Sequence, residues 1–353
     1  MQRRSLLLAA GGAAALPLIG RPAQAQAGAV AGAGSSLTRR VMQKWAEMAG
    51  AGAGLRVAYE GNGSVEGLEQ IKRQAVDFAN VDFAQRSAFV RQNELVQFPT
   101  VVTGVVPFVN LPGVADDQVR LTGELLADIF LGKVTKWNDV RIKEHNAGAS
   151  LPDLAVLPVH SPRTSGTTML FTTYLTRASE AWAAGPRAGT VIQWPANVGA
   201  SVAGQDELVA KMKATPGAIG YGSIGRAREH KFAPVSLRNR AGEFVKPGAA
   251  GFAKAAADAD WNAAAFAVDL VDVETAGAWP ICGASFVLVP EKPTAERVEA
   301  ARNTFKFFDW AYKSGGAVAT ELENPPVPQS AHTHVMEVWR RAKDPSGRPI
   351  WEA

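Results

Sequence analysis

The chain alternates between short apolar runs and amphipathic segments with helical spacing. Apolar runs at residues 55–59, 76–81 and 154–159 have the length and composition of strands. The segments that follow the first and third runs place apolar side chains three or four positions apart, which is the spacing of one helix face. Strands that alternate with helices predict an α/β fold with a largely parallel sheet.

Two further extended runs are long enough to connect separate parts of a fold. Residues 97–110 are rich in Val, Thr and Phe, and residues 281–289 form a second apolar run. Residues 121–140 have helical spacing with a turn at Gly132, and residues 295–313 have the pattern of a long amphipathic helix. The length suggests two domains, and we expect the first extended run to pass between them.

The first 27 residues have the pattern of an export signal rather than of a folded element. Arg3 and Arg4 precede a weakly hydrophobic run rich in Ala and Gly, and cleavage options of the Ala-x-Ala type fall after Ala25 and Ala27. The paired arginines favour twin-arginine export, with the general secretory route as the alternative. No other run approaches the length of a membrane span, so we do not expect an integral membrane protein.

Removing this signal changes the electrostatic character of the chain. The full chain has a formal net charge of +4, and the signal holds three arginines and no acid, so the mature chain carries +1. No basic run is interleaved with aromatic residues, which argues against a nucleic-acid partner.

The sequence offers few side chains for catalysis or metal binding. Cys282 is the single cysteine and lies in an apolar, strand-like run, so we expect a buried and unreactive thiol. His332 and His334 are the one close histidine pair, and no thiol or acid completes a metal site with them. Neither a Gly-x-Ser-x-Gly motif nor a Walker-type loop is present. We therefore expect no enzyme activity, no metal and no cofactor.

A polar loop at residues 160–168 joins a predicted strand to a predicted helix. It contains Arg163, Ser165, Gly166 and Thr167. The first N–H groups of a helix lack internal partners and lie at the positive end of the helix dipole, so they can hold an oxyanion together with nearby hydroxyls. Taken alone, the loop is explained more simply as an N-capped helix.

A series of motifs runs in order through the whole of the expected mature chain. The longest is Ile-Phe-Leu-Gly-Lys-Val-Thr-Lys-Trp-Asn-Asp at residues 129–139. The others are GAGSSL at 32–37, GNGS at 61–64, VDFANVD at 76–82, QFPT at 97–100, LTG at 121–123, SGT at 165–167, PGAIGY at 216–221, AWPI at 278–281 and FFDWAY at 307–312. This ordered set resembles the periplasmic phosphate-binding proteins of Pst-type ABC importers.

The resemblance implies a two-lobed periplasmic-binding-protein fold of type II. Each lobe would be a mostly parallel sheet flanked by helices, with the ligand in the cleft between lobes. The chain would cross near residues 97–103 and 276–281. Residues 28–101 with 280–353 would form one lobe, and residues 102–279 would form the other.

The resemblance also implies a monomeric, periplasmic binding protein that captures phosphate and delivers it to the membrane permease and ATPase of an ABC importer. Ligand binding would close the lobes by a hinge motion. The alternatives are a related oxyanion such as arsenate or a phosphonate, a sensing or scavenging role without an importer, and, less in keeping with the motifs, hydrolysis of a phosphate ester.

The anion ligands implied by the resemblance lie in loops at the ends of predicted strands. Ser36 and Ser64 match hydroxyl donors, and Leu37 matches a position that contributes its backbone N–H. Asp82 matches an acid that contacts the anion, and Ser165, Gly166 and Thr167 match a triplet at a helix start that supplies hydroxyls and N–H groups.

Asp82 would set the specificity of such a site. A carboxylate repels a dianion that has no proton, but it can accept a hydrogen bond from the proton of monohydrogen phosphate. Sulfate has no such proton near neutral pH, so it would meet an unpaired acceptor and a like charge. Arsenate has the same shape and proton and is not excluded. Taken alone, Asp82 would be interpreted as a solvated aspartate in a turn. The matched loops around it favour its interpretation as a residue that binds the anion.

The chain departs from the family just before Ser165. The family has an arginine ligand at the position of Ser161 and its orienting aspartate at the position of Arg163. We hypothesise that Arg163 supplies the displaced charge, because two residues along an extended segment return to the same face. The alternative is that Arg163 points to solvent and the site lacks its arginine, which would weaken binding or change the anion.

Overall fold

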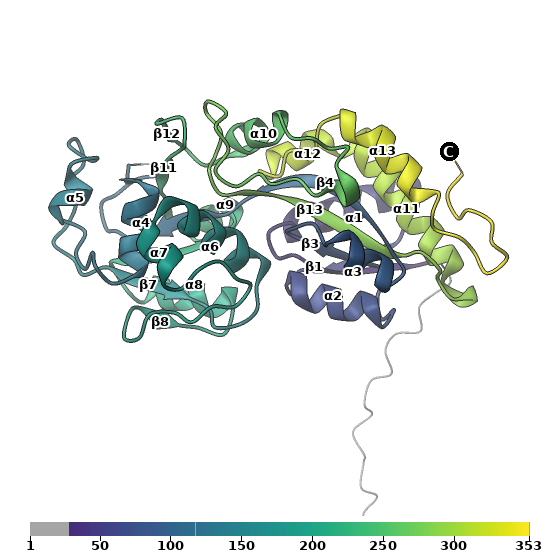
Figure 1. The fold of residues 1–353 in the computed structure, drawn as a ribbon, viewed down its shortest axis with the longest axis horizontal. Helices are drawn as coiled ribbons and strands as arrows, with labels where there is room; N and C mark the ends of the chain where they lie inside the picture. The colour runs from purple at the N-terminus through teal and green to yellow at the C-terminus, as the bar shows by residue number, and fades with distance from the viewer. Residues whose placement is uncertain (1–27, 117, 353) are drawn as a thin grey trace, which may run out of the picture.

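The computed structural model of the protein describes residues 28–116 and 118–352. The expected export signal, residues 1–27, lies outside the described residues. Figure 1 shows two lobes side by side, each with helices packed around strands. Long extended segments run between the lobes along one side of the molecule.

Lobe I is built on a five-stranded sheet with the order β2-β1-β3-β13-β4. Its strands are β1 (Val30–Gly34), β2 (Val57–Glu60), β3 (Phe78–Val81), β4 (Leu95–Gly104) and β13 (Cys282–Pro290). The flanking helices are α1 (Arg39–Ala53), α2 (Ser64–Lys72), α3 (Ser87–Gln92), η2 (Ala295–Arg297), α11 (Val298–Ser314), α12 (Gly316–Glu321) and α13 (Ser330–Trp339).

Lobe II contains a second five-stranded sheet, β10-β5-β9-β7-β8, and a small sheet, β12-β11-β6. The strands are β5 (Val106–Val109), β6 (Arg120–Leu121), β7 (Leu157–His160), β8 (Ala200–Ser201), β9 (Ala218–Gly222), β10 (Ala233–Pro234), β11 (Ser236–Arg238) and β12 (Phe244–Val245). The helices are α4 (Gly123–Phe130), α5 (Val140–Lys143), α6 (Gly166–Ala178), α7 (Glu180–Ala184), α8 (Gln205–Lys213) and α9 (Ile224–Glu229).

The α/β class and the two-lobed architecture are confirmed, and in each large sheet four strands run in the same direction while one strand runs against them. In lobe I, β1 pairs in parallel with β2 and β3, whereas β13 pairs antiparallel with β3 and β4. In lobe II, β7 pairs in parallel with β8 and β9, whereas β5 pairs antiparallel with β9 and β10. The strands that break the parallel order are those by which the chain enters lobe II and returns to lobe I.

A single residue separates the two large sheets at the first passage between lobes. β4 ends at Gly104 in lobe I, and β5 begins at Val106 in lobe II. The chain re-enters the first sheet at Cys282. Before that return, α10 (Ala249–Ala257) and the short η1 (Ala264–Phe266) both pack against β4. Part of the segment expected in the second lobe therefore rests on the first.

The helix expected from residue 38 is present as α1. It buries Val41, Met42, Trp45 and Ala49, which lie on one face, and it ends at Gly54 with φ of 67°. A residue without a Cβ adopts this left-handed conformation at low cost, so glycine is well suited to end the helix.

Trp137 and Cys282 both belong to the buried core. Trp137, in the longest motif, is fully buried, and its indole N–H donates to the Gly217 oxygen at 2.9 Å. Cys282 is fully buried, and burial raises the pKa of its thiol, as expected for an unreactive cysteine.

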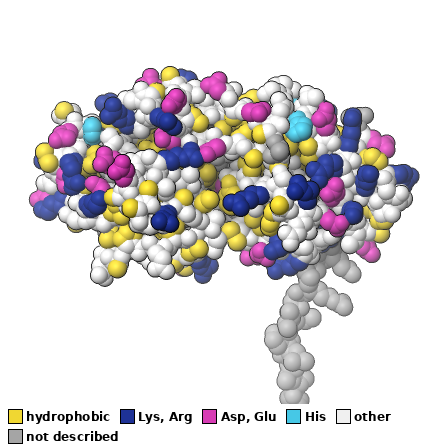
Figure 2. All heavy atoms as spheres, viewed as in Figure 1, with side chains coloured by type: hydrophobic (Ala, Val, Ile, Leu, Met, Phe, Trp, Pro, Cys, Tyr) yellow, Lys and Arg dark blue, Asp and Glu magenta, His cyan; other side chains and the backbone are white. Residues whose placement is uncertain are grey.

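The surface carries charges of both signs. Figure 2 shows basic and acidic side chains interspersed over both lobes on the face in view. Among the residues that the structure describes, no helix has the length and apolar character needed to cross a membrane.

Candidate functional site

A buried carboxylate lies at the end of the central strand of lobe I. β3 ends at Val81, and Asp82 just beyond it is only 2% exposed. Ser35 Oγ donates to one carboxylate oxygen, and Ser64 Oγ donates to the other at 2.9 Å. The Asp82 N–H donates to Ser64 Oγ at 3.2 Å. We call Ser35, Ser64 and Asp82 the serine–aspartate cluster.

Burial is the main influence on the protonation of this cluster. It raises the pKa of the Asp82 carboxyl to about 6, although the hydrogen bonds from Ser35 and Ser64 favour the charged form and oppose the rise. None of these three influences comes from a cation. The carboxyl group therefore changes its charge at mildly acidic pH, above the range of an ordinary aspartate.

The first turn of α6 faces the cluster from lobe II. Ser165 caps the helix, and its Oγ accepts from the Thr168 N–H at 3.3 Å. An ideal Cβ placed on Gly166 would lie 2.6 Å from both Asp82 Oδ2 and Ser64 Oγ. The two lobes are therefore in contact at this point, and only glycine lets the helix come so near.

Three helix N-termini converge here. α2 begins at Ser64, α6 begins at Gly166, and α1 begins two residues after Leu37. The Leu37 N–H donates to Ser35 Oγ at 3.1 Å, and Thr167 is buried in the first turn of α6. This convergence of hydroxyls and backbone N–H groups around one carboxylate is suited to holding an oxyanion that carries a proton.

Ser35 is a member of the cluster that was not among the residues expected from the sequence, and its neighbour Ser36 stays a predicted ligand. Ser35 is fully buried with its hydroxyl on Asp82, whereas Ser36 is half-buried beside it. Gly34, with φ of 135°, ends β1 so close to β3 that an ideal Cβ would lie 2.0 Å from the Asn80 oxygen. This close turn lies directly before Ser35, whose hydroxyl contacts Asp82.

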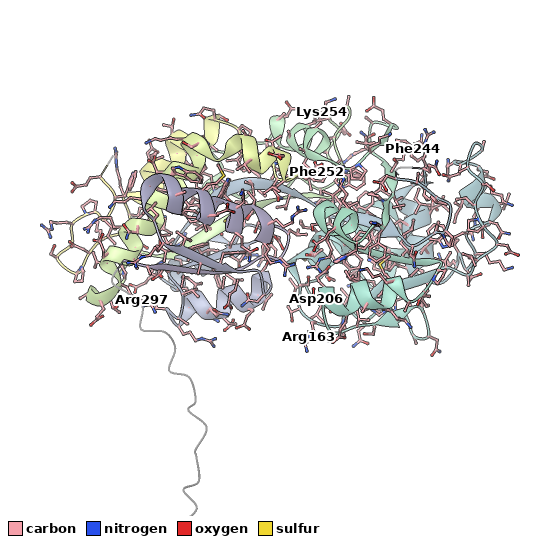
Figure 3. All side chains as sticks on the ribbon, turned by 180° about the vertical axis from the view of Figure 1, so that it is seen from behind. Arg163, Asp206, Phe244, Phe252, Lys254 and Arg297 are labelled. Atoms are coloured by element: carbon pink, nitrogen blue, oxygen red, sulfur yellow. The ribbon has the colours of Figure 1, made fainter. Side chains whose placement is uncertain are left out.

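Arg163 lies on the surface of lobe II. Its side chain is exposed, and Figure 3 shows it at the edge of the lobe. Its backbone N–H donates to Ser161 Oγ at 3.2 Å, but in the described chain no ion pair or hydrogen bond links its guanidinium to Asp82 or Ser64. The hypothesis that Arg163 supplies a ligand charge stays a prediction.

Aromatic side chains that were not predicted support the loop before α6. The Tyr221 and Thr168 hydroxyls are 2.9 Å apart, and the Trp194 indole donates to the Ser161 oxygen at 3.0 Å. Trp194 also stacks on His160, with 4.3 Å between ring centroids. These residues come from separate segments, so no local sequence pattern indicates that they meet.

Replacing Ser165 by alanine should lower the stability of the ligand-free protein by about 1 kcal/mol, because α6 loses its N-cap. It should also weaken anion binding, because this hydroxyl begins the helix that faces the cluster. Denaturant unfolding and calorimetric titration measure the two effects.

Ser179→Ala is the matched control for this prediction. Ser179 accepts from the Trp182 N–H at 3.2 Å and caps α7, at the far end of α6 from Gly166. We expect a similar loss of stability with unchanged binding. An anion affinity equal to wild type in Ser165→Ala would contradict the binding role of Ser165.

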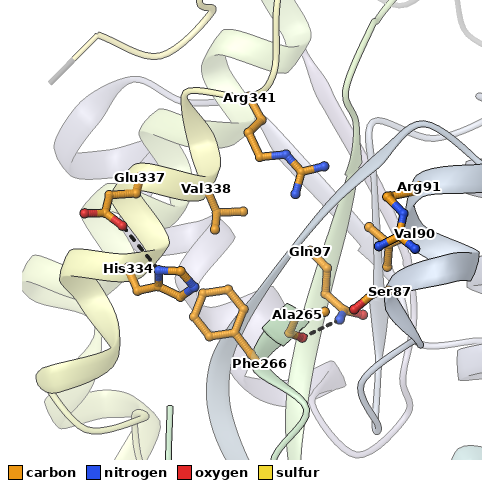
Figure 4. A pocket seen from close by; sticks show the side chains of 10 residues that line it. All are labelled: Ser87, Val90, Arg91, Gln97, Ala265, Phe266, His334, Glu337, Val338 and Arg341. Carbon is orange, nitrogen blue, oxygen red and sulfur yellow. Dashed lines mark hydrogen bonds and ion pairs between the residues drawn. The ribbon is translucent and has the colours of Figure 1, made fainter. Parts of the chain in front are cut away.

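A concavity away from the cluster opens on lobe I between α3, α13 and η1 (Figure 4). It has a volume of about 400 Å³, and Arg91 and Arg341 reach toward it from different elements, beside Phe266 and His334. None of the predicted anion ligands lines it. The serine–aspartate cluster with the start of α6 is therefore the candidate site.

Comparison with known proteins identifies the family. The family model described as a PBP superfamily domain matches residues 20–314. The phosphate-binding protein PstS of Pasteurella multocida is 38% identical over 329 residues, which cover 93% of this chain and 94% of that protein. PstS of Xylella fastidiosa is 37% identical over 313 residues, which cover 88% of this chain and 84% of that protein. The chain belongs to the family of these PstS proteins, within the PBP superfamily.

A solved structure agrees on the fold. The high-affinity periplasmic phosphate-binding protein PfluDING, solved with phosphate bound, superposes with a TM-score of 0.67. The superposition covers 88% of this chain and 93% of that chain at 19% sequence identity. At this identity the likeness supports the two-lobed fold and does not by itself assign a ligand.

Proposed function

We propose that this protein is a periplasmic solute-binding protein that captures monohydrogen phosphate between its lobes and delivers it to an ABC importer. The observation that carries the proposal is the buried Asp82 carboxylate, which holds two serine hydroxyls and faces the first turn of α6 across the interlobe contact. The names of the PstS relatives support phosphate as the anion.

The proposed ligands are the positions expected from the sequence, with Ser35 added from the geometry. They are Ser35, Ser36, Leu37, Ser64, Asp82, Ser165, Gly166 and Thr167, with Arg163 as the cation expected from the sequence. A serine hydroxyl can donate only one hydrogen bond, and in this structure the hydroxyls of Ser35 and Ser64 donate theirs to the Asp82 carboxylate. When phosphate binds, its own proton would be donated to Asp82, and the serine hydroxyls would turn to donate to the anion.

Asp82 would exclude sulfate by charge and by hydrogen bonding. An ionised Asp82 can accept the proton of monohydrogen phosphate, whereas sulfate leaves the carboxylate without a donor and beside a like charge. Leaving a buried acceptor unpaired costs about 1–3 kcal/mol, and more when the group is charged. This difference is sufficient for strong discrimination between two anions of the same shape.

Lobe closure would link binding to transport. The proposed division places residues 28–101 and 280–353 in one lobe and 102–279 in the other, and the change of sheet at Val105 supports its first boundary to within a few residues. A closed, phosphate-loaded form would dock as a monomer on a separate permease. We further propose export through the signal at residues 1–27 and no catalysis of phosphate-ester hydrolysis.

The test is a calorimetric titration of ligand-stripped mature protein at neutral pH. We expect phosphate to bind tightly and sulfate to give no measurable heat. Equal affinity for both anions would contradict the role proposed for Asp82. Binding of arsenate or a phosphonate but not phosphate would show that the fold serves a different oxyanion, and release of phosphate from an ester would contradict the absence of catalysis.

A further inference from the structure

A phosphate dianion beside Asp82 needs positive charge that the serine–aspartate cluster lacks. The contacts of Asp82 described above are two serine hydroxyls and the start of α6, and among the described residues none of them involves Lys or Arg. Like charges at short range repel most strongly where water is excluded. A cation elsewhere in the cleft would offset this repulsion.

The side chain of Arg40 reaches from lobe I to lobe II. Arg40 is the second residue of α1, three positions after Leu37, whose N–H donates to Ser35 Oγ of the cluster. An ideal Cβ placed on Gly225 would lie 2.6 Å from Nη1 of Arg40 and 3.6 Å from its Cζ. The guanidinium therefore lies against the first turn of α9 in the opposite lobe.

α9 and α6 start at the same edge of the lobe II sheet. β9, which precedes α9, pairs in parallel with β7, which precedes the loop to α6. The carboxyl ends of parallel neighbours lie together, at the edge where such sheets bind ligands. Two interlobe contacts therefore lie at this edge of the lobe II sheet. In the first, Gly166 of lobe II approaches the acid Asp82 of lobe I, and in the second, Gly225 of lobe II approaches the cation Arg40 of lobe I.

Arg40 differs from the arginines of α9 in its charge balance. Arg226 pairs with Asp206 at 3.0 Å, and Arg228 pairs with Glu323. Across the described residues, Arg40 forms no ion pair with a carboxylate. It also lies in the first turn of α1, at the positive end of that helix, where a cation is disfavoured. An anion in the cleft would relieve this unfavourable position.

We propose that Arg40, rather than Arg163, supplies the positive charge for the bound anion, and that it does so from the interlobe contact between its guanidinium and Gly225. The inference rests on the proposed binding of phosphate. It identifies a doubly charged ligand, because a singly charged anion beside ionised Asp82 would gain less from the same arginine.

The test compares phosphate affinity at about 10 mM and about 0.5 M salt in wild type, Arg40→Ala, Arg40→Lys and Arg163→Ala. Lys44→Ala is the matched control, because Lys44 lies on the same helix and has its own partner, Glu47, at 2.9 Å. It removes one positive charge without touching the interlobe contact. Calorimetry measures the Kd, and stopped-flow tryptophan fluorescence measures the association rate.

We expect Arg40→Ala to weaken binding at least about tenfold at low salt, with a smaller loss at high salt and a slower association rate. Arg40→Lys should recover most of the phosphate affinity. Arg163→Ala and Lys44→Ala should each bind phosphate more tightly than Arg40→Ala does. A phosphate affinity of Arg40→Ala within about twofold of wild type would overturn this inference and leave the proposed function standing. So would a large loss in Arg163→Ala with none in Arg40→Ala. A wild-type protein that binds no phosphate would overturn the proposed function and this inference together.

Discussion

Replacing Asp82 by asparagine should admit sulfate to the cleft at neutral pH and reduce the preference for phosphate over sulfate by at least about a hundredfold. The amide removes the like charge and can donate to an oxygen that carries no proton, while its size still suits the hydroxyls of Ser35 and Ser64. A hundredfold corresponds to about 2.7 kcal/mol, which is the scale of an unpaired buried acceptor. Calorimetric titration of both anions measures the ratio.

Lowering the pH should have the same effect on the wild-type protein. Because the pKa of Asp82 is raised to about 6, the carboxyl group is mostly neutral at about pH 5 and mostly ionised at about pH 8. Neutral Asp82 can donate to sulfate and does not repel it, so sulfate affinity should rise as the pH falls through 6. Asp82→Asn serves as the control, because its sulfate affinity should lack this transition. A wild-type sulfate affinity that stays flat between these pH values would contradict the assignment.

The same carboxyl group should affect stability without ligand. Its folded pKa of about 6 lies above its ordinary value of 3.8, so it favours folding in the protonated state, and this contribution is lost as the pH rises through 6. The difference corresponds to about 3 kcal/mol. Asp82→Asn should therefore gain stability relative to wild type between about pH 4 and pH 8, as measured by denaturant unfolding of ligand-stripped protein.

Much of the fold and part of the site follow from local patterns. Ser64, Asp82 and Gly166 lie where short apolar strands meet helices, and that alternation is visible in the chain because each strand and helix has its own periodicity. The buried state of Cys282 follows in the same way from the apolar run around it. These predictions depend on neighbours in sequence.

The features that were missed depend on contacts between distant segments. The contact of Ser35 with Asp82 follows from the backbone of Gly34 as it passes β3, which no spacing rule contains. The one reversed strand in each large sheet, β13 or β5, follows from the direction in which the chain passes between the lobes. Arg40 resembles any surface arginine of an amphipathic helix until Gly225 of the other lobe is placed against it.

Gly166→Ala should lower phosphate affinity at least about a hundredfold while leaving the protein folded. The added Cβ would lie 2.6 Å from Asp82 Oδ2 and from Ser64 Oγ, and both atoms belong to a buried, hydrogen-bonded cluster with little room to move. The first turn of α6 would have to retreat, which would hold the lobes apart and withdraw its N–H groups from the anion. Calorimetric titration with phosphate measures the loss.

The fold should tolerate this change, because Gly166 is in a helix with an ordinary backbone conformation, where alanine has the higher helix propensity. The melting temperature without ligand should therefore be unchanged or slightly raised. Gly52→Ala is the matched control: Gly52 also lies within a helix, α1, and an added Cβ there meets nothing within 4 Å. It should keep wild-type affinity. Phosphate binding by Gly166→Ala at wild-type strength would mean that the contact between α6 and the serine–aspartate cluster is not the place where the lobes close on the anion.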